Sequence, residues 1–554
     1  MAVESRPTNA EADTRLVYEV SLAVQAGNLQ RAYELAGVAL GGGVKHPTLF
    51  NARGLWLEQQ GRFDDALIEY RRALALAPGE STIHNAIGLC LLQANRLAEA
   101  VAAFDAAIAL FPNSAQTHYR RGWALGMLGD HDDAKRAHER AIALKPDFAD
   151  SLASLASIAA TDGYPAKTRD YAERALKADP QQATALIAMA SADLLEKEYQ
   201  SAETRLRKLL ADAQISNNPR GTIVRARALG LLGDALDGQD KPAEAFTAYT
   251  SGNDVLRRMN EPRFAAQQRP VDAAKQLAAA FANTLPHIWQ TQEPERQTKN
   301  GPKEHVFLLG FVRSGTTLLE QVLATSPDVV DMEERELLNE PAQQYLTSEA
   351  GLNALALLDG ETLDRHRAHY WNGVREIVGD VEGKVFVDKL PFATIKLPLI
   401  SKLFPRAKII FAIRDPRDVV LSCFRRHFEI NTTMFEFLAL TDGARFYDAV
   451  MSLASLYEER LPLDLHKHRY EDMIEDFDGR VRAVCEFIGI EWTDAMRDFG
   501  QISRKTEIRS PSAPQVRRGL YGEGAYQWRR YANEIAPVLP ILQPWVEKFG
   551  YPKD

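Results

Sequence analysis

The sequence predicts a chain of two parts, an all-α solenoid of paired helices followed by an α/β domain with a parallel sheet. The first half repeats with a period of 34 residues, which is typical of stacked helix pairs. In the second half, short apolar strands alternate with helical stretches, and this alternation favours a parallel sheet with helices on its faces. The first of these strands runs into a glycine-containing turn and a helix, an arrangement that holds anions.

Columns of proline and of small residues define the repeat. The proline follows the second helix of a pair, which it cannot continue, and small residues let two antiparallel helices approach closely. The columns are Pro78, Pro112, Pro146 and Pro180; Gly54, Gly88, Gly122, Ala156 and Ala190; Ala32, Ala66, Ala100, Ala134 and Ala202; and Ala39, Ala73, Ala107, Ala141 and Ala175. Because several columns agree over many units, we interpret them as tetratricopeptide repeats, about seven helix pairs over residues 12–257.

The limits of the domains follow from where this pattern stops. Residues 258–302 are predicted to form a helical linker, since proline and polar residues interrupt the periodicity there. The α/β domain is then expected over residues 303–554. The concave face of the solenoid is expected to bind a partner, and a rigid spacer or a dimerisation arm remain as alternatives.

Composition excludes several classes of function. With 554 residues, 45% hydrophobic and 25% charged, the chain has the composition of a globular protein with substantial cores. A net charge of −9 argues against a general nucleic-acid binder. No run of about 18 apolar residues occurs, so no membrane-spanning helix is expected. The start of the chain lacks the apolar core of a signal peptide. Cys90, Cys423 and Cys485 are far apart and form neither a metal nor a disulfide pattern, so we expect a cytoplasmic protein without a metal.

The turn after the first strand is a phosphate-binding loop without its lysine. The spacing Gly310-x4-Gly315-Thr316-Thr317 fits the Walker pattern, but Thr316 stands where a nucleotide hydrolase carries the lysine that reaches the β- and γ-phosphates. Arg313 supplies a cation instead. The loop is therefore predicted to hold a nucleotide-like anion, while γ-phosphoryl transfer is disfavoured. The alternative is a glycine turn that only joins a core strand to a helix.

The run Arg313-Ser314-Gly315-Thr316-Thr317 resembles the 5′-phosphosulfate loop of the sulfotransferases, whose donor is 3′-phosphoadenosine 5′-phosphosulfate (PAPS). In that family an arginine and a serine eight residues apart, after a strand, bind the 3′-phosphate of the donor. Arg414 and Ser422 have this spacing, so the resemblance implies the same role for them. Arginine offers a fork for phosphate oxygens, and serine adds a neutral donor. The alternative is that Arg414 forms an ion pair with the adjacent Asp415 or Asp418 and binds no phosphate.

Two further segments carry the catalytic residues that the resemblance implies. Lys389, in Val-Asp-Lys-Leu-Pro, resembles the lysine of tyrosylprotein sulfotransferases and of bacterial repeat-bearing relatives, and would neutralise the leaving phosphate together with Arg313. Glu334 takes the place of the catalytic base in the Gly-Glu-Glu-Thr-Arg of the tyrosylprotein enzymes, and Glu333 is the alternative base. The alternatives are that Lys389 is an ordinary surface lysine and that the acidic run around Glu334 is the solvated start of a helix. The arginine that follows in those enzymes is Glu336 here, which weakens any inference of tyrosine sulfation.

Weaker similarities extend the donor site toward the C-terminus. Tyr470 resembles the strand-end tyrosine that lies near the adenine in the family. Ser512 and Arg529 lie in segments similar to the C-terminal lid of the bacterial relatives, where Arg517 or Arg529 is expected to close on the donor phosphates. Surface arginines and a core aromatic residue are the alternatives.

Together these features predict a tetratricopeptide solenoid followed by a P-loop-like α/β sulfotransferase domain. The expected reaction moves the sulfuryl group of PAPS to an acceptor hydroxyl on a protein, peptide or glycan, with the solenoid holding the acceptor. No metal, nucleic acid or membrane is expected to take part. The alternative function is a tetratricopeptide binding scaffold whose α/β domain is inactive or transfers phosphoryl groups. Tyrosine, sugar and small-molecule acceptors all remain open, and so does the oligomeric state.

Overall fold

The computed structural model describes residues 9–212, 219–290, 301–426, 428–500 and 524–553, and the chain divides into two compact units. The first unit comprises Met1–Glu196 and the second Lys197–Asp554. The all-α part and the parallel-sheet part predicted from the sequence are both confirmed. The second unit begins with helices that the repeat pattern counted as solenoid and continues into the α/β domain. The predicted end of the repeats at residue 257 and the predicted end of the linker at residue 302 remain predictions.

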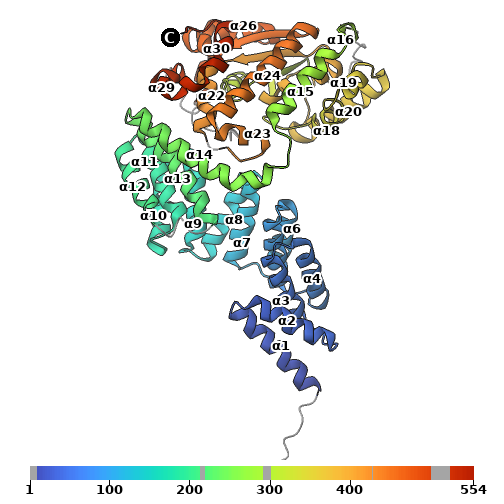
Figure 1. Cartoon of the computed structure of the whole chain (residues 1–554), viewed down its shortest axis with the longest axis vertical. Helices are drawn as coiled ribbons and strands as arrows, with labels where there is room; N and C mark the ends of the chain where they lie inside the picture. Colours follow the sequence, from blue (N-terminus) through green and yellow to red (C-terminus); the bar gives the residue numbers. More distant parts are fainter. Residues whose placement is uncertain (1–8, 213–218, 291–300, 427, 501–523, 554) are drawn as a thin grey trace, which may run out of the picture. The chain divides into compact units, whose positions relative to one another are not determined.

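The first unit is built from helices that follow one another as antiparallel hairpins (Figure 1). Their bounds are α1 (Asn9–Gln25), α2 (Leu29–Gly41), α3 (Pro47–Gln59), α4 (Phe63–Leu76), α5 (Ser81–Gln93), α6 (Leu97–Leu110), α7 (Ala115–Met127), α8 (His131–Leu144), α9 (Ala149–Thr161), α10 (Pro165–Ala178) and α11 (Ala183–Leu195). The repeated alanines are buried in the contacts between these helices, as the repeat pattern requires.

The glycine column has a packing reason. In successive repeats the glycine of the first helix faces an aromatic or imidazole ring of the second helix. A Cβ atom added to the glycine would lie 2.4 to 2.9 Å from the nearest ring atom, closer than carbon atoms can pack. The facing pairs are Gly54 with Tyr70, Gly88 with Phe104, and Gly122 with His138. At these three positions a larger residue would force the facing ring or the helix that carries it to move.

In the described part of the second unit, five helices precede the first strand. They are α12 (Tyr199–Leu210), α13 (Pro219–Gly238), α14 (Pro242–Phe264), α15 (Pro270–Asn283) and α16 (His287–Gln290). The pair α13–α14 repeats the packing of the first unit, because a Cβ on Gly233 would lie 2.4 Å from the ring of Tyr249. Helix α15, predicted as part of a linker, packs on α24 (Leu440–Arg460), where the rings of Phe281 and Tyr457 meet edge-on with centroids 4.7 Å apart.

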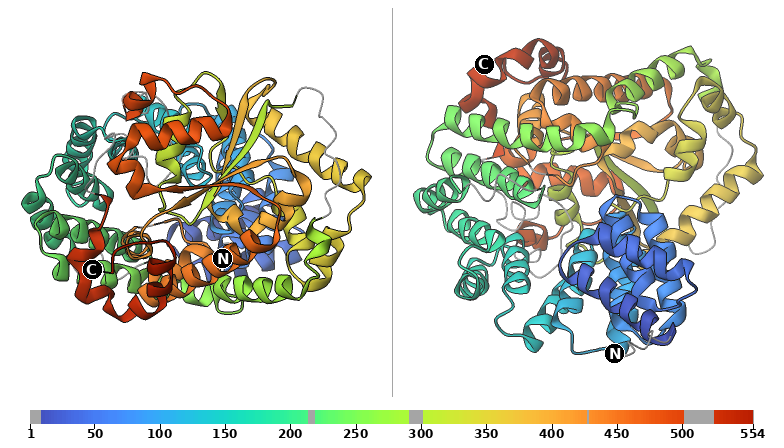
Figure 2. Two further views of the ribbon diagram at one scale, coloured as in Figure 1. Left: turned by 90° about the horizontal axis from the view of Figure 1, so that it is seen from above. Right: turned by 60° about the horizontal axis from the view of Figure 1, so that its bottom comes forward.

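Within the described residues, five parallel strands form one sheet in the order β2-β3-β1-β4-β5 (Figure 2). The strands are β1 (Glu304–Gly310), β2 (Val329–Asp331), β3 (Val385–Lys389), β4 (Lys408–Ile413) and β5 (Asp464–Arg469). The sequence predicts four of them, as Val306–Leu309, Lys384–Val387, Lys408–Ile413 and Lys467–Tyr470, and does not predict the short edge strand β2. Because β1 is central, the loop that follows it lies beside the ends of β3 and β4, where ligands bind in sheets of this kind.

Helices cover the two faces of this sheet. Helices not yet described are α17 (Thr316–Leu323), α18 (Asn339–Tyr345), α19 (Glu349–Ala356), α20 (Gly360–Val378), α21 (Leu397–Leu403), α22 (Pro416–Arg425), α23 (Thr432–Phe435), α25 (Tyr470–Glu475), α26 (Phe477–Ile488), α29 (Ala532–Ile535) and α30 (Leu539–Lys548). Short 3-10 helices are η2 (Pro391–Lys396), η3 (Glu436–Leu438), η4 (Asp494–Asp498), η6 (Gln527–Tyr531) and η7 (Ala536–Val538). Along the described chain, no helix combines the length and the apolar character needed to cross a membrane.

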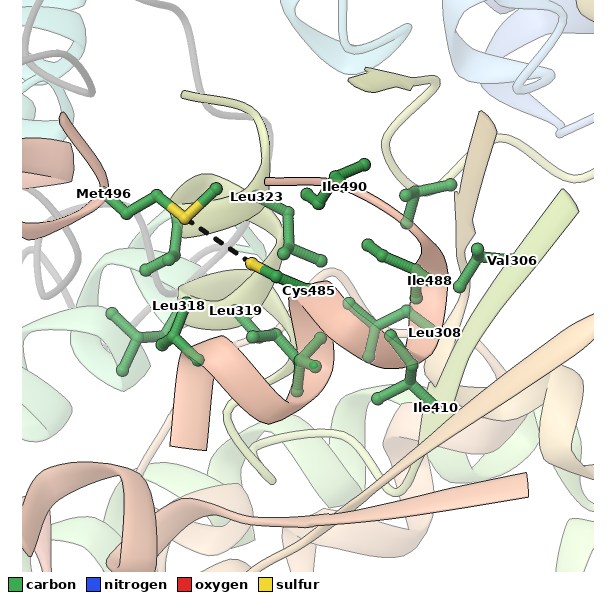
Figure 3. Packing of buried hydrophobic residues seen from close by; sticks show 14 of the residues in the cluster. Val306, Leu308, Leu318, Leu319, Leu323, Ile410, Cys485, Ile488, Ile490 and Met496 are labelled. Carbon is green, nitrogen blue, oxygen red and sulfur yellow. Dashed lines mark hydrogen bonds between the residues drawn. The ribbon is translucent and has the colours of Figure 1, made fainter. Parts of the chain in front are cut away.

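Alternating residues of β1 serve the two faces. Val306 and Leu308 point into a core shared with α17 and α26 (Figure 3), while Phe307 packs on the opposite face against the ring of Phe404. Cys485 lies in the first of these cores with its Sγ 3.7 Å from the Sδ of Met496. All three cysteines of the chain are buried. This two-sided core fixes the end of β1 and the start of α17, and thereby the loop between them.

Candidate active site

The loop between β1 and α17 needs glycine at both of its ends. Gly310 has φ +150°, and a Cβ there would lie 2.6 Å from the carbonyl oxygen of Ala412 on β4. Gly315 has φ +94°, and a Cβ there would lie 2.7 Å from the ring of Tyr470. Between them Arg313 adopts the left-handed conformation, with φ +69°, which non-glycine residues rarely do. The helix α17 begins at Thr316 as predicted, so its N-terminus opens onto this loop.

Thr394 holds the start of the loop, and the sequence did not single it out. Its hydroxyl accepts a hydrogen bond from the Gly310 N–H at 3.0 Å. The same oxygen lies 2.8 Å from the carbonyl oxygens of Gly310 and Pro391, to which it can donate its proton. Thr394 is fully buried on η2, directly after β3. A buried threonine therefore joins the end of β3 to the loop after β1.

The three residues predicted around the two donor phosphates meet in space. Arg313 Nε donates to Ser422 Oγ at 3.1 Å, so the loop contacts helix α22. Arg414, just beyond the end of β4, donates from Nη1 to the Arg313 carbonyl oxygen at 2.9 Å and from Nη2 to the carbonyl oxygen of Gly524. Its guanidinium carbon also lies 4.9 Å from the ring centroid of Tyr470. Two arginines and a serine hydroxyl thus converge beside an anion-binding loop.

The aspartates beside Arg414 have other partners. The Asp415 carboxylate accepts hydrogen bonds from Arg417 Nε at 2.9 Å and from Arg417 Nη2 at 2.7 Å, and this ion pair is completely buried. Asp418 accepts a hydrogen bond from the Trp528 N–H at 2.8 Å. Burial raises the pKa of Asp418 to about 6, although the nearby charge of Arg414 acts to lower it. The pairing of Asp415 with Arg417 leaves Arg414 directed at the loop.

A lysine between two glutamates lies at the end of β3. Lys389 Nζ donates to Glu334 Oε1 at 2.7 Å and lies 3.2 Å from Glu320 Oε2. The side chains of Lys389 and Glu320 are 1% and 2% exposed, whereas that of Glu334 is 35% exposed. Glu334 is therefore the member of this group that an acceptor can reach from solvent.

Glu320 is a part of the site that the sequence did not reveal. It lies on α17, in which all eight residues are buried, and a lone carboxylate in such a helix was the available signal. Burial raises the pKa of Glu320 to about 8, against the lowering effect of the Lys389 ammonium. For Lys389, burial acts to lower the pKa, but the charges of Glu320 and Glu334 outweigh it and the pKa is raised. The lysine is thus kept charged inside the protein.

This buried carboxyl predicts how stability changes with pH. Between its ordinary pKa of 4.5 and its folded pKa of about 8, Glu320 keeps a proton that the unfolded chain has released, so stability falls as pH rises through this range. His305 and His468, with pKa lowered to about 3 by burial, act in the opposite sense only below about pH 6.5. We therefore expect the melting temperature to fall between pH 6.5 and 8.5, and to fall less in Glu320→Gln.

Thermal unfolding followed by circular dichroism across this pH range would test the expectation. Part of the fall should survive the substitution, because burial also raises the pKa of Asp388, to about 7. An equal fall in the two proteins would show that Glu320 does not carry the extra proton.

A second buried network supports the end of β3. The Tyr370 hydroxyl donates to Asp388 Oδ2 at 2.6 Å, and His305 Nε2 lies 3.1 Å from the same hydroxyl. Asp388 directly precedes Lys389 on the strand, so this network fixes the backbone that carries the lysine. Sequence reasoning treated Asp388 only as part of a motif.

The acidic segment after β2 has distinct partners for its members. Of the two neighbouring carboxylates proposed as the base, Glu334 is the one whose oxygen contacts Lys389. Glu333 has φ +55°, and its N–H donates to Asp331 Oδ1 at 3.3 Å. Glu336, which replaces the arginine of the tyrosylprotein enzymes, forms an ion pair with Lys396 at 2.6 Å.

The C-terminal candidates are only partly placed. Tyr470 is 7% exposed and packs against Gly315, below Arg414. Arg529 is exposed on η6, with its guanidinium carbon 4.9 Å from the ring centroid of Tyr526. Ser512 and Arg517 lie outside the described residues. Among the residues that are described, no group of three or more His, Cys, Asp or Glu side chains is arranged to hold a metal ion.

Comparison with known proteins relates both units to existing families. Residues 305–494 match the sulfotransferase family, and residues 19–81, 51–115 and 119–183 match the tetratricopeptide repeat. An uncharacterized protein of Aquifex aeolicus is 29% identical over 261 residues, which cover 45% of this chain and 34% of that protein. The match thus spans about a third of the length of that relative. Protein-tyrosine sulfotransferase 1 of Danio rerio is 24% identical over 258 residues, 44% of this chain and 72% of that protein.

Among solved structures, the chain aligns with PilW, a type IV pilus biogenesis factor. The identity is 20% and the TM-score 0.34, over 39% of this chain and 98% of that one.

Proposed function

We propose that this chain, which joins tetratricopeptide repeats to a sulfotransferase-family domain, transfers a sulfuryl group from PAPS to a hydroxyl group of a protein or peptide. One observation carries the proposal. The loop after β1, which gathers Arg313, Arg414 and Ser422, follows the central strand, and the Lys389–Glu334 pair stands at the end of its neighbour β3. An anion site and a candidate proton acceptor therefore share one edge of the sheet.

The residues present fit a donor with phosphate groups at both ends of its nucleoside. The backbone N–H groups of the loop, with Arg313 and the N-terminus of α17, suit the 5′-phosphosulfate. Arg414 and Ser422 suit the 3′-phosphate, because they offer a charged fork and a neutral donor. Thr316 cannot replace the lysine that phosphoryl transfer uses in such loops, which favours sulfuryl over phosphoryl transfer.

The reaction then assigns a task to each residue. The donor supplies an activated sulfuryl group on a phosphate leaving group. The oxygen of the acceptor hydroxyl bonds to sulfur, and the bond from sulfur to the phosphate oxygen of the donor breaks. Glu334 takes the proton that the acceptor hydroxyl releases. Lys389 stabilises the negative charge that develops on the phosphate. Glu320 orients Lys389, since its Oε2 lies 3.2 Å from the ammonium.

The acceptor is inferred from two observations. The related Danio rerio protein is named a protein-tyrosine sulfotransferase, which supports a protein or peptide hydroxyl. The tetratricopeptide repeats support a large acceptor, because such solenoids bind partners and raise their local concentration. The ion pair of Glu336 with Lys396 replaces the arginine expected for acidic peptides, so an acidic tyrosine site is not favoured.

Incubation of the purified protein with sulfur-labelled PAPS and a cell extract would test the proposal. Label is expected in material that protease treatment digests. Label found only in protease-resistant glycan would show that the acceptor is a glycan and not a protein or peptide. The absence of transfer to any component would contradict the proposed activity.

Nucleotide binding offers a separate test of the 3′-phosphate site. Adenosine 3′,5′-bisphosphate should bind roughly tenfold or more tightly than AMP, because AMP leaves the Arg414 site without its anion and a charge-assisted contact contributes about 1.5–3 kcal/mol. Arg414→Gln should remove most of this difference. Calorimetric titration with both nucleotides measures it, and equal affinities in the wild-type protein would contradict the assignment.

A further inference from the structure

One carboxylate joins three segments of the second unit. Asp237, in the last turn of α13, accepts hydrogen bonds from Arg425 at the end of α22, from Arg530 Nη1 at 2.7 Å and from the Tyr531 hydroxyl at 2.6 Å. The side chains of Asp237 and Arg425 are only 14% and 16% exposed. The described site residues do not include Asp237, and the predicted sulfotransferase domain does not reach it.

The charges around Asp237 make this contact hard to replace. A carboxylate in the last turn of a helix lies near the partly negative helix end, so it needs cations close by. Arg530 supplies one and also donates from Nη2 to the backbone carbonyl of Asp237 at 2.8 Å, an oxygen that accepts from the Asp240 N–H as well, at 3.0 Å. Arg425 supplies the other, and its guanidinium carbon lies 5.3 and 5.2 Å from the ring centroids of Tyr249 and Tyr531. Without the carboxylate, its largely buried charge would lose its ion pair.

Helix α14 holds the same end of α22. Asn253 is 2% exposed, and its Nδ2 donates to the Phe424 carbonyl at 2.9 Å. This carbonyl is one of those that the end of α22 leaves without a partner inside the helix. The rings of Phe246 and Phe424 stack with centroids 5.1 Å apart. The position of α22 therefore depends on both helices of the pair α13–α14.

The two segments that Asp237 holds both touch the arginines of the proposed donor site. Ser422 lies three residues before Arg425, about one helical turn away, and accepts the hydrogen bond of Arg313. The other segment, residues 524–531, begins with Gly524, whose carbonyl oxygen accepts from Arg414. We infer that Asp237 is a positioning residue for the 3′-phosphate site and that the α13–α14 pair is a structural part of the donor site.

The inference rests on the proposed function, because it places Asp237 behind groups that would bind PAPS. Its test compares Asp237→Asn with Asp240→Asn. Asp240 accepts from the same Arg530 at 3.0 Å, but its side chain is 86% exposed. Dissociation constants for adenosine 3′,5′-bisphosphate and for AMP would be measured by calorimetry in the wild type and both variants, with circular dichroism as the check of folding.

The ratio of the two constants is the readout, since a general loss of structure would weaken both ligands alike. We expect the wild type and Asp240→Asn to prefer the bisphosphate roughly tenfold or more, and Asp237→Asn to prefer it about threefold or less while AMP binding is nearly unchanged. If Asp237→Asn keeps the wild-type preference for the bisphosphate, or loses affinity for both ligands equally, the inference about Asp237 is wrong and the proposed donor site still stands. A wild-type protein without the preference would overturn the proposed donor site as well.

A second variant covers the case in which Asp237→Asn does not fold. Tyr531→Phe removes one hydrogen bond to Asp237 and leaves both ion pairs in place. The preference for the bisphosphate should then fall by a smaller factor, about twofold to threefold. An unchanged preference in this variant would overturn the inference.

Discussion

Replacing Glu334 with glutamine is expected to lower the rate of sulfuryl transfer by about a hundredfold or more while donor binding is retained. The amide keeps the shape of the carboxylate and can still accept the hydrogen bond of Lys389, but it cannot take a proton from the acceptor. Lys389 would keep its contact with Glu320, so its position should persist. The initial rate with labelled PAPS and the affinity for adenosine 3′,5′-bisphosphate measure the two quantities separately.

Glu333→Gln is the matched control, because Glu333 is the adjacent carboxylate on the same segment. It should transfer sulfate within a few-fold of the wild-type rate. A normal rate in Glu334→Gln together with a large loss in Glu333→Gln would reassign the base to Glu333. A normal rate in both would mean that neither residue accepts the proton.

Removal of residues 1–196 should leave a folded chain that binds adenosine 3′,5′-bisphosphate, whereas removal of residues 1–300 should abolish folding. The shorter product loses Asp237, the partner of Arg425, and Arg269, the partner of Glu436, which is 1% exposed. Removing one partner of a buried ion pair costs about 3–5 kcal/mol. Arg425 and Glu436 would each be left largely buried without this partner, and the packing of Phe281 on Tyr457 would be lost as well, against a whole stability of about 5–15 kcal/mol for a domain.

Circular dichroism and calorimetry on the two shortened chains would measure folding and nucleotide binding. A chain of residues 301–554 that folds and binds the nucleotide like the full protein would show that α12 to α16 are dispensable. With residues 1–196 removed, transfer to the natural acceptor should fall further than transfer to a small phenol. Equal falls would assign the repeats a structural role.

Local sequence was sufficient to predict the loop and the geometry around it. The strand, turn and helix around Gly310 and Gly315 are contiguous, so their conformation follows from short-range rules. Arg414 comes directly after β4, and Ser422 lies on α22, the next helix along the chain. Because this segment is continuous, their spacing could be compared with a motif. Their convergence with Arg313 depended only on the order of adjacent parallel strands.

Other parts depend on contacts that no local pattern records. Strand β2 has three residues, all of them only partly buried, so its sequence carries no clear alternation. Glu320 and Thr394 act through partners far along the chain, and in isolation each is an ordinary helix or turn residue. Periodicity predicted the helix pairs over residues 12–257, with a helical linker after them, but it cannot tell which domain a helix packs against, and α15 packs on α24 through Phe281.

The buried cysteines make the chain suitable for site-specific labelling. Burial raises the pKa of Cys90 and Cys423 to about 12 and that of Cys485 to about 11. Because the thiolate is the reactive form, maleimides and oxidants should act on these thiols very slowly in the folded protein. Cysteines introduced at one exposed position in each unit would then carry spin labels with little background. Distances between such labels would report how the two units are arranged in solution.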